Sequence, residues 1–358
     1  MIARIVTWAV EKRWLVLLLT VIVAAIGAFS LYRLPIDAVP DITNNQVQIN
    51  VRAPALSPEL VEKQVSFPIE TALAGTPGLE YTRSLSRNGF AQITAVFSDA
   101  TDIYFARQQV GERLRGVQEN LPDGVNPEMG PIATGLGEVY MYTVRLDHRE
   151  DDKHKPGEPG QQPDGSYITP EGERLTTEED KATYLRTAQD WIVTPLLKTT
   201  PGLAGVDSIG GYAKQFLVVP DVQKLASLGI TLTDLGNALE RNNTSVGGGF
   251  VNRNGEGLAV RSDALVRNAS ELARTVIATR NGVPITVEQV ATVKTGQAIR
   301  MGSASENGTE VVVGTAIMRI GENSRIVSTA VAEKLKTINA SLPPDVVIQP
   351  VLNRTELV

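Results

Sequence analysis

The chain has 358 residues, 42% of them hydrophobic, with a formal net charge of −6 at pH 7 and a mean hydropathy of −0.05. This length suffices for two or three domains with their own cores, and the hydropathy excludes a chain made mostly of membrane spans. The lack of cysteine excludes disulfides and thiolate metal sites, the two histidines argue against a histidine-based zinc or catalytic centre, and the lack of a basic tract argues against nucleic acid as a partner.

The first predicted element is a membrane-spanning helix over Trp14–Leu31. Its eighteen residues carry no charge. At a rise of about 1.5 Å per residue, the helix nearly crosses the roughly 30 Å hydrocarbon core of a bilayer. A cleaved signal peptide usually has a shorter apolar region of about 7–15 residues, and a buried core helix usually has a polar face. An anchor in a lipid bilayer is therefore favoured over both alternatives.

The charges that flank this run predict its orientation. Lys12 and Arg13 precede it, whereas Arg33, Asp37 and Asp41 follow it, so the basic excess lies on the N-terminal side. Because basic residues favour the cytoplasmic side of a membrane, we expect the N-terminus in the cytoplasm and the chain after Leu34 outside.

A βαββα order follows the membrane helix. Leu34–Thr43 contains two prolines and reads as an extended exit from the membrane. The alternation of apolar and polar residues predicts the strand, and Asn88-Gly89 predicts the hairpin. The predicted elements are a strand over Gln46–Arg52, a helix from Ser57 to about Ala74 interrupted at Pro68, a hairpin of Glu80–Ser86 and Phe90–Phe97, and a helix over Ile103–Leu121.

The same order recurs further along the chain. Thr200-Pro201-Gly202-Leu203 repeats Thr76-Pro77-Gly78-Leu79. Two punctuated copies at a nearly constant offset predict an α+β fold with duplicated βαββα units of the ferredoxin-like type. The predicted elements of the second copy are a strand over Glu138–Leu146, a helix over Lys181–Lys198, a hairpin of Gly205–Ile209 and Lys214–Val219, and a helix from Asp221 to about Asn242 with a break at Gly229.

A glycine-rich segment, Thr244–Gly257, contains Gly247, Gly248 and Gly249. It lacks the GxxxxGK[ST] pattern of a phosphate-binding loop, so it predicts a long exposed hairpin or arm. The remaining predicted elements are strands over 258–262, 275–278, 283–286, 291–295 and 310–318, a helix over 324–338 and a strand over 346–351.

A polar insertion over residues 148–180 interrupts the second copy after its first strand. It is charged and rich in glycine and proline, which predicts a solvated, mobile loop. It contains His148, Glu150, Asp151, Asp152 and His154, all of types that bind metal ions. Lysine and arginine are interspersed and nothing fixes the geometry, so a plain polar loop is favoured over a metal site.

Five stretches carry a resemblance to a known family. In order and spacing they resemble the N-terminal portion of an inner-membrane pump of the resistance–nodulation–division superfamily, in its heavy-metal efflux branch. Residues 148–180 carry no such resemblance. The stretches are PIDAVPDIT (Pro35–Thr43), SPELVEKQVSFPIETALAGTPGLE (Ser57–Glu80), SLSRNGFAQITAVFSDATDIYFARQQVGERL (Ser84–Leu114), LPDGVNPEMGPIATGLGEVYMYTV (Leu121–Val144) and AQDWIVTPLLKTTPGLAGVDSIGG (Ala188–Gly211).

The resemblance implies a division of the chain and a set of partners. It implies a homotrimer with a periplasmic adaptor and an outer-membrane channel, driven by proton antiport, with the metal ion as substrate and no cofactor. The arm around Gly247, Gly248 and Gly249 would reach a neighbouring protomer. The implied parts are a lead-in and transmembrane helix (1–33), a first porter subdomain (34–135), a second porter subdomain (136–182 and 297–335), a docking or funnel subdomain (183–296) and a closing strand (336–358) before a second span.

Glu138 is the candidate metal ligand. By resemblance, an acidic residue in Gly135-Leu136-Gly137-Glu138 lies near the entrance of the porter cleft in members that export divalent ions, where monovalent-ion members carry an apolar aromatic residue. The alternative is a solvated carboxylate at a strand end, since a lone carboxylate cannot define a site. Met129, Met141 and Met301 are scattered, which favours packing roles over a thioether site.

Four other readings are weighed against a divalent-metal pump. One is a signal-anchored periplasmic binding or adaptor protein, which a stop codon directly after codon 358 would favour. Another is a drug-exporting pump of the same superfamily, and within the metal branch copper or silver stays open. An extracytoplasmic enzyme is unsupported, because the sequence has no nucleophile elbow and no HExxH.

Overall fold

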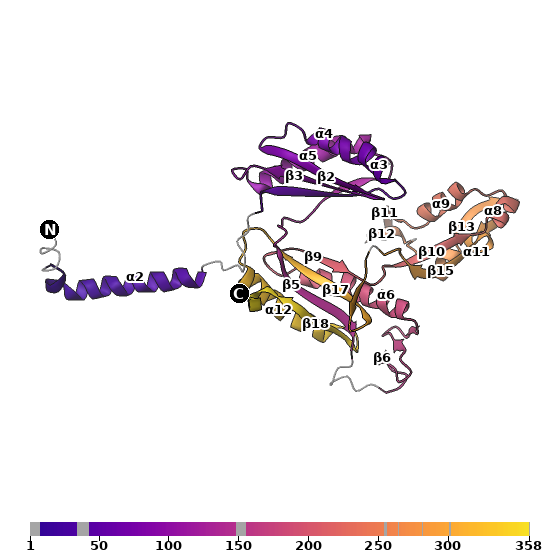
Figure 1. Ribbon diagram of the computed structural model, residues 1–358. Coiled ribbons are helices and arrows are strands. Elements are labelled where there is room, and N and C mark those ends of the chain that lie inside the picture. Colours follow the sequence, from indigo (N-terminus) through magenta and orange to yellow (C-terminus); the bar gives the residue numbers. More distant parts are fainter. Residues whose placement is uncertain are drawn as a thin grey trace.

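The computed structural model describes residues 8–33, 43–147, 155–253, 256–263, 265–280, 282–300 and 302–357. Helix α2 (Arg13–Arg33) stands apart from the folded remainder (Figure 1). Its window Arg13–Ser30 is long and apolar enough to cross a membrane, with a mean hydropathy of 2.1, and none of it is buried in the protein. This exposure does not fit a helix buried in the core of the described chain. Residues 34–42 of the predicted exit, and the candidate ligands His148, Glu150, Asp151, Asp152 and His154, lie outside the described residues.

The first folded unit is an antiparallel sheet in the order β2-β3-β1-β4. Arg87 pairs with Phe90, so the predicted hairpin about Asn88-Gly89 is confirmed, with Gly89 at a φ of +71°. The predicted first strand is also confirmed, and its burial alternates along its length. The strands are β1 (Gln46–Arg52), β2 (Leu79–Arg87), β3 (Phe90–Phe97) and β4 (Asn126–Met129).

Helices cover one face of this sheet (Figure 1). The predicted first helix is divided into α3 (Pro58–Val61), a π-helical turn η1 (Glu62–Ser66) and α4 (Phe67–Leu73). Pro68 is the second residue of α4, and the wide π turn before it makes room for a ring that would press on the preceding turn of an α-helix. The second helix is α5 (Ile103–Val117), continued by η2 (Gln118–Asn120). The buried residues of these helices recur at helical spacing: Val61, Val65, Ile69, Leu73, Ala106, Val110, Leu114 and Val117.

The second folded unit repeats the strand order of the first with strands drawn from distant parts of the chain. Its sheet runs β16-β17-β5-β18, and β9 also pairs with β17. The path β9-β17-β5-β18 therefore corresponds to β2-β3-β1-β4. The strands are β5 (Glu138–Leu146), β9 (Leu203–Ile209), β16 (Ala304–Glu306), β17 (Thr309–Met318) and β18 (Val346–Asn353).

The predicted hairpin of Gly205–Ile209 with Lys214–Val219 is wrong. β9 pairs with β17, whereas β10 (Lys214–Pro220) pairs with β15 (Ala291–Gln297). Gly210 and Gly211 have positive φ values of +89° and +60°, but they carry the chain out of the unit instead of turning it back. A Cβ on Gly211 would lie 2.6 Å from the Ala182 carbonyl oxygen, so the crossing needs glycine for close approach.

The helical layer of the second unit resembles that of the first. It consists of α6 (Glu178–Ala188), a π-helical turn η3 (Gln189–Val193), α7 (Thr194–Leu197) and α12 (Ser324–Ser341). Pro195 follows η3 as Pro68 follows η1. Both units thus use the same device, a π turn directly before a proline near the start of the next helix.

The third folded unit lies between β9 and β16 in the chain. The predicted helix from Asp221 is confirmed with its break, as α8 (Val222–Leu228) and α9 (Leu232–Arg241) separated at Gly229, whose φ is +57°. A small core joins its helices to its strands. Its other elements are β11 (Ser245–Arg253), β12 (Glu256–Asp263), α10 (Ala269–Ala273), β13 (Val276–Arg280), β14 (Val283–Thr286) and α11 (Val287–Val290).

The packed units differ from the predicted segments at two boundaries. The helix and strand over 183–209, expected in the docking part, pack into the core of the second unit instead. α12 and β18 also belong to this unit, so residues 336–353 are not a separate closing strand. The second core contains Leu185, Val193, Leu197, Leu203, Val206, Leu335, Ile338 and Val346.

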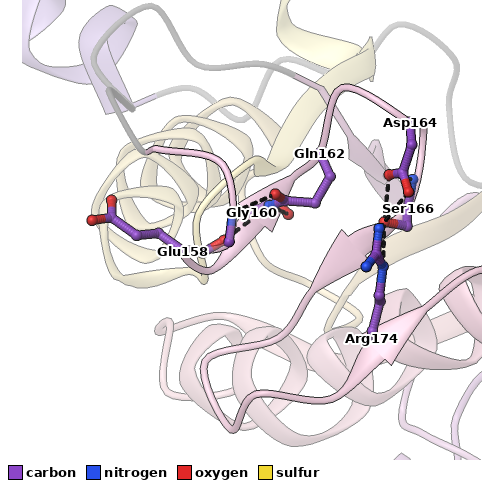
Figure 2. A network of polar contacts seen from close by, with 7 residues as sticks. Glu158, Gly160, Gln162, Asp164, Ser166 and Arg174 are labelled. Carbon is purple, nitrogen blue, oxygen red and sulfur yellow. Dashed lines mark hydrogen bonds and ion pairs between the residues drawn. The ribbon is translucent and has the colours of Figure 1, made fainter.

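The described part of the polar insertion is folded, contrary to the predicted mobile loop. It forms a small meander of β6 (Gly160–Gln161), β7 (Tyr167–Ile168) and β8 (Arg174–Leu175). Tyr167 is fully buried, and its hydroxyl donates to the Pro344 carbonyl oxygen at 2.8 Å. Figure 2 shows the polar contacts within the meander, where Arg174 meets Asp164 and Ser166. Tyr167 and Leu175 both lie in the second core, so buried side chains attach this polar segment to it.

Asp164 in this meander gives a pH-dependent prediction. Hydrogen bonds from Ser166 Oγ at 2.6 Å and Ser166 N at 3.0 Å, followed by the Arg174 guanidinium, lower the pKa of Asp164 to about 2. The pKa in the folded chain lies below the ordinary value of about 3.9, so the stabilisation is complete above about pH 4 and is lost as the pH falls toward 2.

We expect the carboxyl carbon of Asp164, observed by NMR in an aspartate-labelled chain, to titrate near pH 2. Asp164→Asn removes the signal and so identifies it. Ser166→Ala should raise the midpoint, because it removes the hydrogen bond from Ser166 Oγ, which is the largest single cause of the shift. A midpoint near 3.9 in the unchanged chain would contradict the network.

Candidate functional site

Glu138 is the first residue of β5 and is exposed. It lies opposite Ile317, next to a register shift that places one extra residue, Val139, on β5. A bulge of this kind re-aims the side chain beside it. The turn before Glu138 is closed by a hydrogen bond from Gly137 N to Thr134 O at 2.9 Å, and it is tied to β17 by one from Met318 N to Gly137 O at 2.7 Å. The strand end that presents this carboxylate is therefore well ordered.

A second carboxylate lies on the same face of the sheet. Asp207 on β9 is exposed and opposite Thr315, two residues from the partner of Glu138 along β17. Directly opposite residues of a sheet share a face, so Asp207 and Glu138 both lie on the face away from the helices. They are two strands apart, roughly 10 Å or more. The pair by itself is too wide to hold one small ion.

Glu306 is a third carboxylate near this sheet, and it is already paired. It accepts a hydrogen bond from Thr143 Oγ1 at 3.2 Å and an ion pair from Arg145 Nη1 at 3.2 Å. Arg145 also contacts Asp147. Two carboxylates share one guanidinium in this cluster, and Glu306 already has two partners, which makes it a poor cation ligand.

Within the described ranges, no group of three or more histidine, aspartate or glutamate side chains is placed to hold a metal ion. Glu138 and Asp207 could each supply one oxygen ligand to a site completed by other groups. The sequence reasoning missed Asp207, because an aspartate alternating with apolar residues in a strand is an ordinary surface pattern. Met129 lies in the first sheet and Met141 in the second, and Met301 lies outside the described residues.

The predicted glycine-rich hairpin is confirmed as β11 paired with β12. The register shifts between Gly247 and Phe250, and Gly249 has a φ of +86°. The glycines thus form an irregularity in the hairpin. Just beyond it, Phe250 is 77% exposed.

Comparison with known proteins identifies the family. The model of the AcrB/AcrD/AcrF family matches residues 5–358. The nickel-cobalt-cadmium resistance protein NccA of Alcaligenes xylosoxydans xylosoxydans is 56% identical over 360 residues, which cover 100% of this chain and 34% of NccA. The nickel and cobalt resistance protein CnrA of Cupriavidus metallidurans is 54% identical over the same shares of the two chains. A crystal structure of a heavy metal efflux pump matches with a TM-score of 0.81 and 29% identity over 98% of this chain and 32% of that one.

The chain belongs to the AcrB/AcrD/AcrF family, a family of efflux transporters of the resistance–nodulation–division class. Within it, the chain is similar to the heavy-metal resistance proteins. It spans about a third of the length of the curated relatives it matches. The match to NccA covers the whole chain, so residues 148–180 lie inside the matched region, contrary to the expectation from sequence.

Proposed function

We propose that this chain is part of a proton-driven pump that exports divalent heavy-metal cations, of which zinc, cobalt, cadmium and nickel are the candidates. The observation that carries the proposal is the 56% identity, over the entire chain, to a protein whose name states resistance to nickel, cobalt and cadmium. The transported ion is the substrate, and the proton gradient supplies the energy without a cofactor. Trp14–Leu31 has no ionisable side chain, so the proton-carrying groups must lie elsewhere in the pump.

The folded units have proposed roles in such a pump. The first unit and the second unit serve as duplicated porter subdomains of the ferredoxin-like type, and the third unit (214–297) serves as the docking subdomain. The shared strand order of the two sheets and the repeated π turn before a proline support the duplication. The separate small core of the third unit supports its role as a distinct subdomain.

The proposed assembly is a homotrimer in the bacterial inner membrane with its N-terminus in the cytoplasm and its folded units in the periplasm. The arm of β11 and β12, with Gly247, Gly248 and Gly249, reaches the next protomer. A periplasmic adaptor and an outer-membrane channel complete the export path. The unburied helix α2 and the exposed Phe250 support these contacts with lipid and protein.

Glu138 is the proposed metal ligand near the entrance to the transport path, and Asp207 lies on the same face. Replacing Glu138 by glutamine in the full-length pump removes the negative charge but keeps the size. We expect the resistance of cells to cobalt, nickel, cadmium and zinc to fall, with the apparent affinity weakened about tenfold, or about 1.4 kcal/mol. The measurement is growth across a metal series, with protein levels matched.

The exposed Glu288 of α11 offers a matched control, since Glu288→Gln makes the same change in the third unit. Its metal resistance should equal that of the unchanged pump. If the Glu138→Gln pump gave the same metal resistance as the unchanged pump, Glu138 would not be a ligand on the transport path. Protection against hydrophobic drugs but not metals would favour a drug-exporting pump, and protection against copper or silver alone would favour monovalent ions.

A further inference from the structure

The turn before Glu138 accepts a hydrogen bond from a residue far away in the sequence, Arg354. Arg354 begins helix α13 (Arg354–Leu357), directly after β18, and its Nη1 donates a hydrogen bond to the Leu136 carbonyl oxygen. Only 9% of Arg354 is exposed, and 218 positions separate it from Leu136 in the chain. Burying a guanidinium is costly unless its donors find acceptors, so this hydrogen bond strongly favours one placement of the Leu136 carbonyl.

The local sequence makes the conformation of this turn sensitive to that hydrogen bond. Gly135 and Gly137 flank Leu136, and glycine leaves the backbone free to adopt many conformations. A Cβ on Gly137 would lie 3.0 Å from the Met318 carbonyl oxygen and 3.1 Å from that of Thr134, so a side chain would crowd this position. A side chain at position 137 therefore cannot be used to restrict the conformation of this turn. The direction of the turn depends on backbone hydrogen bonds and on contacts from outside the turn. Leu136 is only two residues before Glu138.

We propose that Arg354 is a positioning residue for Glu138. By holding the Leu136 carbonyl, it fixes the direction in which the strand end presents the carboxylate to a divalent cation. Residues that orient a metal ligand without touching the ion commonly contribute about 10–100-fold to metal affinity. This inference rests on the proposed role of Glu138 as a ligand.

A matched contact lies at the other end of the same connector. Arg107 of α5 donates to the Gly130 carbonyl oxygen at 2.7 Å, and burial lowers its pKa from the ordinary arginine value. It makes the same kind of bond to the segment that joins the two sheets, but eight residues from Glu138 instead of two. Loss of Arg107 should loosen the connector without redirecting the carboxylate.

The test measures cobalt transport by the full-length pump in proteoliposomes, as KM and kcat. We expect Glu138→Gln and Arg354→Gln each to raise the KM for Co²⁺ about tenfold. The double variant should be no worse than Glu138→Gln alone, because the group that Arg354 positions has already been removed. By contrast, any factor by which Arg107→Gln raises the KM should multiply the factor caused by Glu138→Gln in the double variant. Arg354→Lys, which keeps one donor and the charge, should recover most of the wild-type KM.

The outcomes separate this inference from the proposed function. Suppose that Glu138→Gln raises the KM and that the effect of Arg354→Gln on the KM multiplies with it, as the effect of Arg107→Gln does. Arg354 then only stabilises the fold, and the positioning role is wrong. If Glu138→Gln leaves KM unchanged, the ligand role of Glu138 fails and the positioning role fails with it. If Arg354→Gln does not assemble, Arg354→Met takes its place in the cycle, because it lacks the donors of arginine. A rise in KM that disappears in the Glu138→Gln background supports the positioning role, and a rise that persists there, or no rise at all, overturns it.

Discussion

Replacing Gly314 by alanine should destabilise the second folded unit, so that its strands open more often. Gly314 lies in β17 directly opposite Tyr142 of β5, and the Tyr142 ring lies across it. An added Cβ would overlap Cζ and Oη of Tyr142 and come within 2.5 Å of Cε2. Tyr142 is fully buried and accepts a hydrogen bond from the buried Gln189 at 3.1 Å, so the ring has little room to move.

Overpacking a core costs about 1–3 kcal/mol, and leaving a buried polar group without its partner costs about 1–3 kcal/mol more. We therefore expect Gly314→Ala to lower the free energy of opening of this unit by about 3 kcal/mol or more. Hydrogen exchange of the β5 and β17 amides, followed by mass spectrometry, measures that opening locally. Burial raises the pKa of the Tyr142 hydroxyl, which stays neutral throughout such an experiment.

The control is the same substitution where a methyl group fits. Gly236 is exposed in α9, and a Cβ there would meet nothing within 4 Å. Gly236→Ala should leave exchange unchanged or slow it, because alanine favours a helix over glycine by about 1 kcal/mol. Adding Tyr142→Leu to Gly314→Ala should cost less than the two changes summed, since the clash is gone. Simple additivity would show that the ring is not the obstacle.

The second large effect is expected at Asp345, which ties the polar insertion to the second unit. Asp345 is fully buried, with a φ of +58°. Its Oδ2 accepts a hydrogen bond from Gln161 N at 2.6 Å, and its carbonyl oxygen accepts one from Asp147 N at 2.8 Å. The residue at this position must therefore tolerate a left-handed backbone and also supply an acceptor for a buried N–H.

The two demands predict an order of variants. Asp345→Asn keeps an oxygen acceptor and tolerates the left-handed region, so it should cost least. Asp345→Gly relieves the backbone but loses the acceptor, at about 1.5–3 kcal/mol. Asp345→Ala loses both, adding about 1–2 kcal/mol. Hydrogen exchange of the segment 160–175 should then rise about 60-fold to several thousandfold for alanine, at about 1.4 kcal/mol per decade.

Asn307 isolates the backbone part of this effect. It also has a positive φ, of 51°, but it is exposed in the turn between β16 and β17. Asn307→Ala should therefore cost only the left-handed strain of about 1–2 kcal/mol. An Asp345→Ala variant no worse than Asn307→Ala would mean that the Gln161 contact contributes nothing to the attachment of the insertion.

Sequence reasoning located Glu138 but not its surroundings. The motif Gly135-Leu136-Gly137-Glu138 is contiguous, so it is visible in a linear text. Asp207 and Arg354 reach the same region only because β9 and β18 lie in one sheet with β5. Nothing local to either residue marks such a contact.

The local elements of this protein follow from short-range patterns in its residues. Alternation placed β1, Asn88-Gly89 placed the first hairpin, and a charge-free run placed α2, because each depends on neighbours within a few residues. The order of elements in the first unit followed, since its strands are nearly consecutive in the chain.

The strands that complete the second unit depend instead on long-range packing. Gly210-Gly211 has the local chemistry of a hairpin turn, yet the strand that β9 pairs with lies about a hundred residues further on, at β17. Tyr167 likewise sits in a polar stretch that composition assigns to solvent, yet it is buried in the second core. Strand pairing and burial depend on which surfaces meet in space, and a single sequence carries no local signal for a partner so far away.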